Sequence, residues 1–193
     1  KPNHYQAILN LKNLYKNNQL YDEGIFFLTD QIRKDSMNIS YNLDLVELYF
    51  LNEQMEKSNE AWFSGLERYK RNRSYYRLLN NIFTKYDLKK NMEILVKNGR
   101  EQFGFSFLAF ELGVYYQSKN DYILAMNEFT IDLLDNKKNY NRIGKQILLM
   151  SDDKNSHTII EADLLKILHK KPDLISKILS DFYFKLQMFE SSF

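Results

Sequence analysis

The chain has 193 residues, 44% hydrophobic and 27% charged, which is enough for one domain or one short array of repeats. Its 27 basic and 25 acidic residues leave a formal net charge of +2, so there is no global attraction to nucleic acid or to an anionic membrane. The absence of cysteine excludes disulfides, cysteine-ligated zinc and thiol catalysis, and no run approaches the about 18 apolar residues of a membrane span.

Few residues interrupt helices in this chain. It contains only 6 glycines and 2 prolines, which favours an all-α protein with short connections. The chain begins with Lys1 rather than methionine, as we expect of a fragment or a processed product.

The first part of the chain carries a pattern of large and small residues at helical spacing. In chain order, the first copy consists of Leu11, Lys12, Tyr15, Gln19, Tyr21, Gly24 and Leu28. The second copy lies 34 residues further on and consists of Leu45, Val46, Tyr49, Glu53, Met55, Ser58 and Trp62. Tyrosine recurs at one site, as Tyr15 and Tyr49, and a small residue recurs at another, as Gly24 and Ser58.

A weaker third copy and a clear fourth copy follow. The third holds Tyr76, Leu79, Phe83, Met92, Leu95 and Val96. The fourth holds Leu112, Gly113, Tyr116, Asn120, Tyr122, Ala125 and Phe129. The third copy is one residue shorter than the others, and we expect the missing residue near residues 86–88.

The last part of the chain fits a looser fifth copy and a final helix. The first helix of this copy holds Ile143, Ile147, Leu148 and Met150. The second is predicted from Thr158, capped by a box with Glu161, to about His169, with one face formed by Ile159, Ala162, Leu165 and Leu168. After Pro172, the final helix runs over about residues 173–190 and carries Leu174, Ile178, Phe182 and Leu186.

A 34-residue helix–turn–helix period with these large and small sites resembles the tetratricopeptide repeat family. The fourth copy matches that pattern at Leu112, Gly113, Tyr116, Ala125 and Phe129, but has Ala109 in place of the tryptophan. The family's final proline appears only once, as Pro172. The resemblance covers about residues 5–172 and implies a right-handed solenoid of helical hairpins.

The predicted organisation is a single repeat domain over residues 1–193. Its hairpins cover about residues 5–38, 39–72, 73–105, 106–139 and 140–172, and the final helix closes the array as a cap. Within a hairpin the two helices must approach closely. We therefore expect Gly113 and Ala125 to make room, with Tyr116 and Phe129 packed around the contact.

The sequence contains no pattern that indicates catalysis. There is no phosphate-binding loop, no nucleotide-binding glycine motif and no serine elbow, and the three histidines have no partner at metal-ligand spacing. Glu47 and Glu111 come nearest to a carboxylate in an apolar stripe, but their register places them on the inner side of the array. We therefore predict no enzyme activity, no metal and no cofactor.

One basic segment could bind single-stranded nucleic acid by charge and stacking. In residues 67–77, Tyr69, Tyr75 and Tyr76 alternate with five cations, which are Arg68, Lys70, Arg71, Arg73 and Arg77. The other interpretation is an exposed junction between hairpins with the tyrosines packed inward. The near-zero net charge favours this second interpretation.

In the resembled family the first helix of each hairpin lines a concave groove. By register, the candidate partner groove consists of Asn13, Glu47, Phe50, Arg77, Asn81, Phe107, Phe110, Val114 and Gln117. Further inner positions are Gln6, Leu9, Lys16, Leu43, Thr84, Lys145, Leu148 and Ser151. The apolar members suggest a partly hydrophobic groove for a peptide or a helix. Alternatively, they pack against neighbouring hairpins.

Some members of that family clamp the acidic tails of heat-shock chaperones with lysine, asparagine and arginine. Here Asn13 matches one clamp position. The others hold Leu9, Asp44, Ser74 and Leu78, and an aspartate repels a carboxylate. We therefore reject this particular function.

Three hypotheses for function remain. The favoured one is an adaptor or scaffold that binds a peptide, a helix or a partner subunit in the groove. The second is a regulatory or substrate-recruiting segment of a larger enzyme. The third is single-stranded nucleic-acid binding through residues 68–77.

Overall fold

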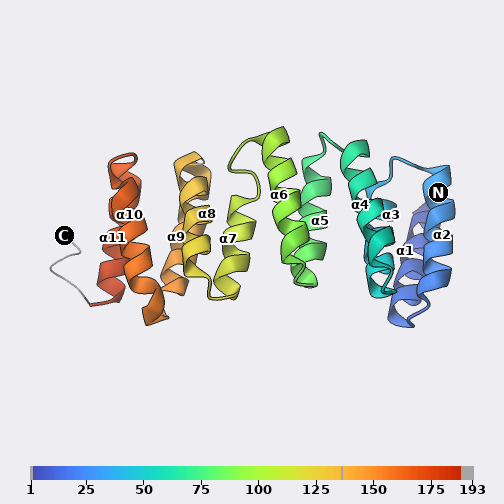
Figure 1. The fold of residues 1–193 in the computed structure, drawn as a ribbon, viewed down its shortest axis with the longest axis horizontal. Helices are drawn as coiled ribbons and strands as arrows, with labels where there is room; N and C mark the ends of the chain where they lie inside the picture. Colours follow the sequence, from blue (N-terminus) through green and yellow to red (C-terminus); the bar gives the residue numbers. More distant parts are fainter. Residues whose placement is uncertain (1, 136, 188–193) are drawn as a thin grey trace. The chain divides into compact units, whose positions relative to one another are not determined.

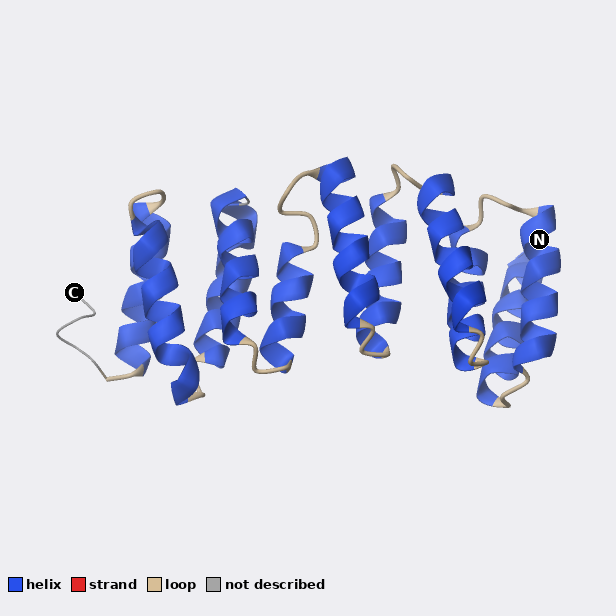
Figure 2. Ribbon diagram, viewed as in Figure 1, coloured by secondary structure: helices blue, strands red, loops and turns tan. Residues whose placement is uncertain are grey.

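The structure is a computed structural model, and it confirms an all-α chain. It describes residues 2–135 and 137–187, with the side chains of all of these except 2–7, 9 and 137. In this part of the chain there are eleven α-helices and no strand, joined by short loops (Figure 2).

The helices follow one another in neighbouring pairs (Figure 1). The helices that open each pair, called first helices below, are α1 (Pro2–Asn17), α3 (Ile39–Leu51), α5 (Arg73–Lys85), α7 (Ala109–Ser118) and α9 (Tyr140–Met150). Their partners are α2 (Tyr21–Lys34), α4 (Met55–Arg68), α6 (Lys89–Phe103), α8 (Tyr122–Asp135) and α10 (His157–Leu168). Two short 3-10 helices, η1 (Lys137–Asn139) and η2 (Lys154–Ser156), adjoin α9 and α10, and α11 (Pro172–Lys185) follows the fifth pair.

The helices form two compact units, Lys1–Leu95 and Val96–Phe193. In the first unit, one buried cluster joins Ile8, Leu28, Tyr41, Leu45 and Leu48. In the second unit the buried residues include Leu112, Met126, Phe129, Ile147, Ile160 and Phe182. Each unit therefore has its own apolar core.

The turn inside each of the first four pairs has the same backbone geometry. One residue in each turn is left-handed, namely Gln19 (φ 58°), Glu53 (φ 56°), Asp87 (φ 57°) and Asn120 (φ 58°). The amide of the following residue donates to the carbonyl of the recurring aromatic residue, with N···O distances of 2.8–3.0 Å to Tyr15, Tyr49, Phe83 and Tyr116. This hydrogen bond satisfies a carbonyl that the helix end leaves without an intrahelical partner.

The spacing of these turns corrects one prediction. The left-handed residues are 34, 34 and 33 positions apart, so the shortening does not lie near residues 86–88. It lies between α6 and α7, where Gly104 (φ 103°) and Leu108 (φ 60°) are left-handed and α7 begins only at Ala109. A surface connection tolerates the loss of a residue, whereas the tight turn would lose its closing hydrogen bond.

The small sites lie where two helices of a pair approach closely. Gly113 in α7 faces the Phe129 ring of α8, and a Cβ atom at Gly113 would lie 2.6 Å from Phe129 Cε1. At the equivalent contact in the second pair, the Ser58 hydroxyl donates to the Val46 carbonyl over 2.9 Å. These contacts agree with the role predicted for the small residues.

The fifth pair corrects a second prediction. α10 begins at His157 with Ser156 as its N-cap residue, so Thr158 does not cap it. The buried face of α10 consists of Ile160, Leu164 and Ile167, not of the stripe predicted one position away, of which Leu165 is 48% exposed. The buried Ser156 hydroxyl donates to the Met150 carbonyl over 2.9 Å, which ties the residue before α10 to the end of α9.

The final helix α11 ends at Lys185, and residues 188–193 lie outside the described part of the chain. Of its predicted stripe, Ile178 and Phe182 are buried, while Leu174 and Leu186 are only half-buried. A spacing of four drifts around a helix of 3.6 residues per turn, so the ends of the stripe leave the buried face. After α11, Gln187 has the left-handed backbone (φ 60°) found in the turns that end first helices.

Gly113 provides a test of this packing. We expect Gly113→Ala to lower the free energy of unfolding of the second unit by about 1–3 kcal/mol, because the new methyl group overlaps the Phe129 ring. The matched control is Gly144→Ala in α9, where the new Cβ would lie 3.6 Å from Ile178, an ordinary contact. It should stabilise the helix by up to about 1 kcal/mol. Urea unfolding followed by circular dichroism measures both, and equal stabilities would contradict the packing described.

Candidate functional site

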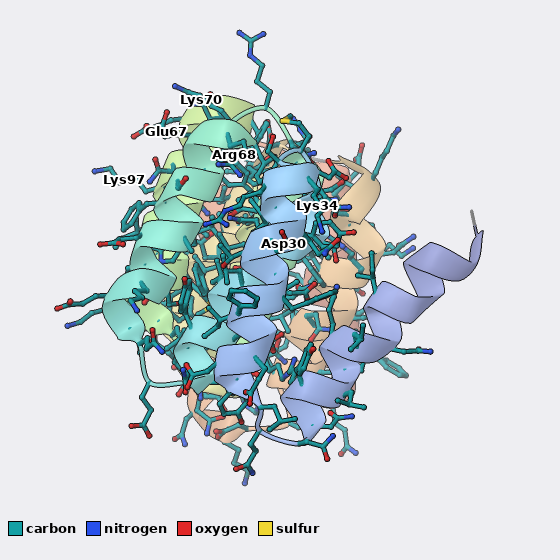
Figure 3. All side chains as sticks on the ribbon, turned by 90° about the vertical axis from the view of Figure 1, so that its right-hand side faces the viewer. Asp30, Lys34, Glu67, Arg68, Lys70 and Lys97 are labelled. Carbon is teal, nitrogen blue, oxygen red and sulfur yellow. The ribbon has the colours of Figure 1, made fainter. Side chains whose placement is uncertain are left out.

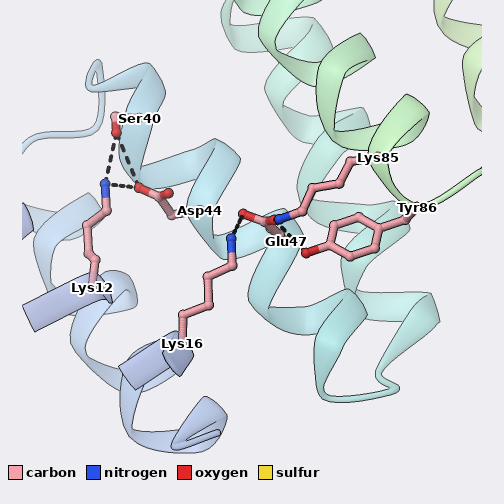
Figure 4. A network of polar contacts seen from close by, with 7 residues as sticks. All are labelled: Lys12, Lys16, Ser40, Asp44, Glu47, Lys85 and Tyr86. Atoms are coloured by element: carbon pink, nitrogen blue, oxygen red, sulfur yellow. Dashed lines mark hydrogen bonds and ion pairs between the residues drawn. The ribbon is translucent and has the colours of Figure 1, made fainter. Parts of the chain in front are cut away.

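In the first unit, the first helices share a network of charged side chains (Figure 4). Its centre is Glu47 of α3, which is only 9% exposed. Lys16 Nζ of α1 lies 2.6 Å from Glu47 Oε2, and Lys85 Nζ of α5 donates to Oε1 over 2.9 Å. The Tyr86 hydroxyl donates to the same oxygen over 2.6 Å. One carboxylate thus joins three successive first helices.

The network sets the protonation state of Glu47. Burial by itself would raise the pKa of the Glu47 carboxyl, but the hydrogen bonds from Lys16, Tyr86 and Lys85 outweigh it and lower the pKa below its usual value. The hydrogen bond to Glu47 correspondingly raises the pKa of Lys85. The pair is therefore fully ionised at neutral pH.

A second ion pair lies beside it on the same helices. Lys12 of α1 pairs with Asp44 of α3, and the Lys12 ammonium also donates to the Ser40 hydroxyl over 3.0 Å. Ser40 in turn donates to Asp44 over 3.2 Å. Burial raises the pKa of Asp44, and the contact with Lys12 acts in the opposite direction.

The predicted groove residues of the first unit therefore differ in how far a partner could reach them. Glu47 is buried and bonded to its neighbours, and the Phe50 ring is half-buried with its centroid 4.6 Å from that of Tyr86. Asn13, Arg77 and Asn81 are exposed. The side chains of Gln6 and Leu9 lie outside the described part. On these helices Asn13, Arg77 and Asn81 therefore remain accessible, whereas Glu47 and Phe50 are covered.

In the second unit, packing covers most of the predicted apolar groove residues. Phe107 is only 5% exposed, because it precedes the late start of α7 and its ring lies 4.6 Å from that of Phe103. Phe110 is half-buried, with the Arg142 guanidinium of α9 3.6 Å from its ring centroid. Val114 is also half-buried.

Polar contacts also join α7, α8 and α9, the first of which carries the predicted groove residues Phe110, Val114 and Gln117. The half-buried Gln117 donates to the Gln146 carbonyl over 3.3 Å. The Asp132 carboxylate of α8 accepts two hydrogen bonds from Asn139, of 2.8 and 3.0 Å, and lies 3.9 Å from Arg142. Burial raises the pKa of Asp132 despite these partners. The predicted groove residues on α7 therefore mainly contact other helices of this unit.

A pocket in the second unit lies beside α9, the first helix of the fifth pair. It lies between α9 and α11, has a volume of about 430 Å³, and is lined by Tyr140, Asn141, Gly144, Lys145, Leu148, Lys177, Ile178 and Asp181. The register had assigned two of these, Lys145 and Leu148, to the inner side of the array. Lys177 Nζ lies 6.0 Å from the Tyr140 ring centroid, and burial together with the nearby Asp181 raises the pKa of Tyr140.

The other half of this pocket lies outside the predicted groove. Lys177 and Asp181 belong to α11, which the sequence pattern predicts as a capping helix and not as part of the groove. The absence of a side chain at Gly144 leaves space above Ile178, and only the packing of α11 on α9 reveals that space. A spacing of 67 residues, which also separates the second and fourth copies, relates Phe110 and Val114 to Lys177 and Asp181 and is the sequence signal that points to α11.

The basic segment places its aromatic side chains inside the first unit. Tyr69, Tyr75 and Tyr76 are all buried. The Tyr75 hydroxyl donates to Asn42 Oδ1 over 2.7 Å, and the Tyr69 hydroxyl donates to the Ser36 carbonyl over 3.0 Å. Burial raises the pKa of Tyr75. In this conformation the three rings are not available to stack on nucleotide bases.

The fold and its surfaces define the chain as an all-α protein built from repeated helix pairs. No protein-family model matches the sequence, and no curated protein matches it. Within the described residues, no cluster of three or more acidic and histidine side chains is arranged to hold a metal ion. No described helix combines the length and the apolar character needed to cross a membrane.

Glu47 makes the stability of the first unit depend on pH. Because the folded pKa lies below the ordinary value of 4.5, the stabilisation is complete above pH 4.5 and is lost as the pH falls through the folded value. We expect Glu47→Gln to lower the free energy of unfolding at pH 7 by about 1–3 kcal/mol, and the difference from wild type to shrink towards about pH 2.

Urea unfolding followed by the fluorescence of Trp62 measures this, since Trp62 is the only tryptophan and lies in α4 of the first unit. The control is Asp30→Asn, which removes the exposed pair of Asp30 with Lys34 and should change stability by less than about 1 kcal/mol. A Glu47→Gln effect of the same size at both pH values would show that the ionised network does not stabilise the fold.

Proposed function

We propose that this protein is an adaptor or scaffold that binds a segment of a partner protein on the surface of its first helices. The observation that supports the proposal is the pocket between α9 and α11. Its volume of about 430 Å³ lies within the range of about 300–1,000 Å³ that is usual for ligand sites.

The lining of the pocket matches an amphipathic segment. Tyr140, Leu148 and Ile178 provide apolar surface for a buried side chain of the partner. Lys145 of α9, and Lys177 and Asp181 of α11, can meet charges of either sign that flank this side chain. Such mixed charge fixes the orientation of a segment more than it adds affinity.

The exposed polar residues of the first unit fit the same proposal. Asn13 and Asn81 carry amide groups that can bond to the backbone of a bound segment, and the ionised network around Glu47 holds the helices that carry them. A surface whose helices are already held in place loses little conformational entropy on binding. Affinity for a single segment would be micromolar, about −8 kcal/mol.

Leu148 tests the proposal. Peptides selected from a random displayed library on the immobilised full chain are titrated against the protein by fluorescence anisotropy. We expect micromolar dissociation constants, and Leu148→Ser should weaken binding by about tenfold because it removes apolar pocket surface.

The matched control is the neighbouring Leu149, which is 57% exposed and does not line the pocket. Leu149→Ser should change affinity by less than about twofold. If both variants weaken binding equally, or neither does while both remain folded, the pocket is not the binding site.

A further inference from the structure

A second pocket lies in the first unit, between α1 and α2. It has a volume of about 620 Å³ and is lined by Tyr15, Asp22, Glu23, Phe26, Phe27 and Asp30. Figure 3 looks onto α2, on which Asp30 and Lys34 are labelled, and shows α1 leaning away from α2 toward the N-terminal end of α1. Among its described lining residues, Tyr15 comes from the last turn of α1 and the others come from α2.

The lining combines aromatic rings with carboxylates, and none of its described residues is basic. The ring centroids of Tyr15 and Phe27 are 5.9 Å apart, and Phe26 is 79% exposed. Rings and carboxylates together attract an organic cation, the rings through their negative faces and the carboxylates through their charge.

Among the described residues of the unit, only part of this negative charge is compensated by a partner. Asp30 pairs with Lys34, and Asp22 accepts a hydrogen bond of 2.8 Å from the neutral amide of Asn52. Among the residues that the structure describes, no cation pairs with Asp22 or with Glu23. An added cation would therefore meet uncompensated carboxylates.

The second helix pair shows which cation fits. The Lys57 ammonium lies 5.9 Å from the ring centroid of Tyr49 and donates to Gln54 Oε1 over 2.8 Å. In the 34-residue register, Tyr49 corresponds to Tyr15 and Lys57 corresponds to Glu23. In the first pair, then, the tyrosine is kept but the lysine beside it is replaced by a carboxylate.

Packing alone does not explain all of the pocket's side chains. The second pair has Glu60, Ala61 and Ser64 at the positions of Phe26, Phe27 and Asp30, and it packs its helices closely without them. Phe27 contributes to the core of the first unit, but the exposed Phe26 and Glu23 do not. Phe26 and Glu23 are therefore free to contact a ligand without loss of core packing.

We propose that this pocket binds a lysine side chain, flanked by apolar residues, on a segment of a partner protein. The ammonium group lies over the Tyr15 ring beside Glu23 and Asp22, as Lys57 lies over Tyr49 one repeat later. The apolar neighbours of the lysine pack on Phe26 and Phe27. The site uses other residues than the α9–α11 pocket and does not depend on the function proposed above.

The test uses the full chain labelled with nitrogen-15 and the peptide acetyl-Ala-Leu-Lys-Leu-Ala-amide. We expect its addition to shift the amide signals of residue 15 and of residues 22–30. Replacing the lysine of the peptide by norleucine, which keeps the shape but removes the charge, should weaken binding by about fivefold. Raising the salt to about 0.5 M should weaken binding of the lysine peptide toward that of the norleucine peptide.

Two variants of Glu23 separate recognition from general charge. Glu23→Lys places the chain's own ammonium group over Tyr15, as in the second pair, and should abolish binding while the fold is retained. Glu23→Gln should weaken binding by about fivefold. The control Glu60→Gln on α4 changes the net charge equally and should leave binding unchanged.

The proposal is overturned if the norleucine peptide binds as tightly as the lysine peptide, or if Glu23→Lys retains binding. It is also overturned if free spermidine binds as tightly as the peptide, since the pocket would then take a small polyamine. Signals of the same residues that change with protein concentration alone would instead identify a second copy of the chain as the occupant.

Discussion

The structure depends on the close approach of the two helices in each pair. Gly113 against Phe129, and Ser58 bonded to the Val46 carbonyl, bring the helix axes near enough for large side chains to fill the remaining space. The left-handed turns between these helices support the same contact, because the recurring aromatic residue accepts the hydrogen bond that closes each turn. One local arrangement, repeated every 33 or 34 residues, thus organises most of the chain.

This repetition leaves certain positions free to vary, and the candidate sites lie at those positions. Lys57 and Glu23 occupy equivalent positions in successive helix pairs. The Lys57 ammonium lies over the Tyr49 ring, whereas Glu23 lines a pocket beside Tyr15 and gives it negative charge. In the same way, Gly144 leaves space above Ile178, where a side chain would partly fill the α9–α11 pocket. Differences between copies, rather than the repeat itself, give each surface its chemistry.

The candidate groove was only partly predictable from the sequence. The register placed Glu47 on the face of the first helices, but it could not reveal that Lys85 and Tyr86, 38 and 39 residues away, saturate its carboxylate. It also placed Phe107 on a helix, whereas α7 begins only at Ala109 and leaves Phe107 buried. Side chains from distant helices decide whether a position is open, and sequence spacing carries no information about them.

The sequence by itself determined the all-α class, the succession of helix pairs and the small sites between them. These features follow from the local periodicity of apolar residues and from turn chemistry, both of which act over a few residues. Tertiary structure decided where the register shortens, which face of α10 is buried, and which polar groups remain accessible. These outcomes depend on contacts between helices far apart in the chain, because burial and ion pairing are properties of the packed unit.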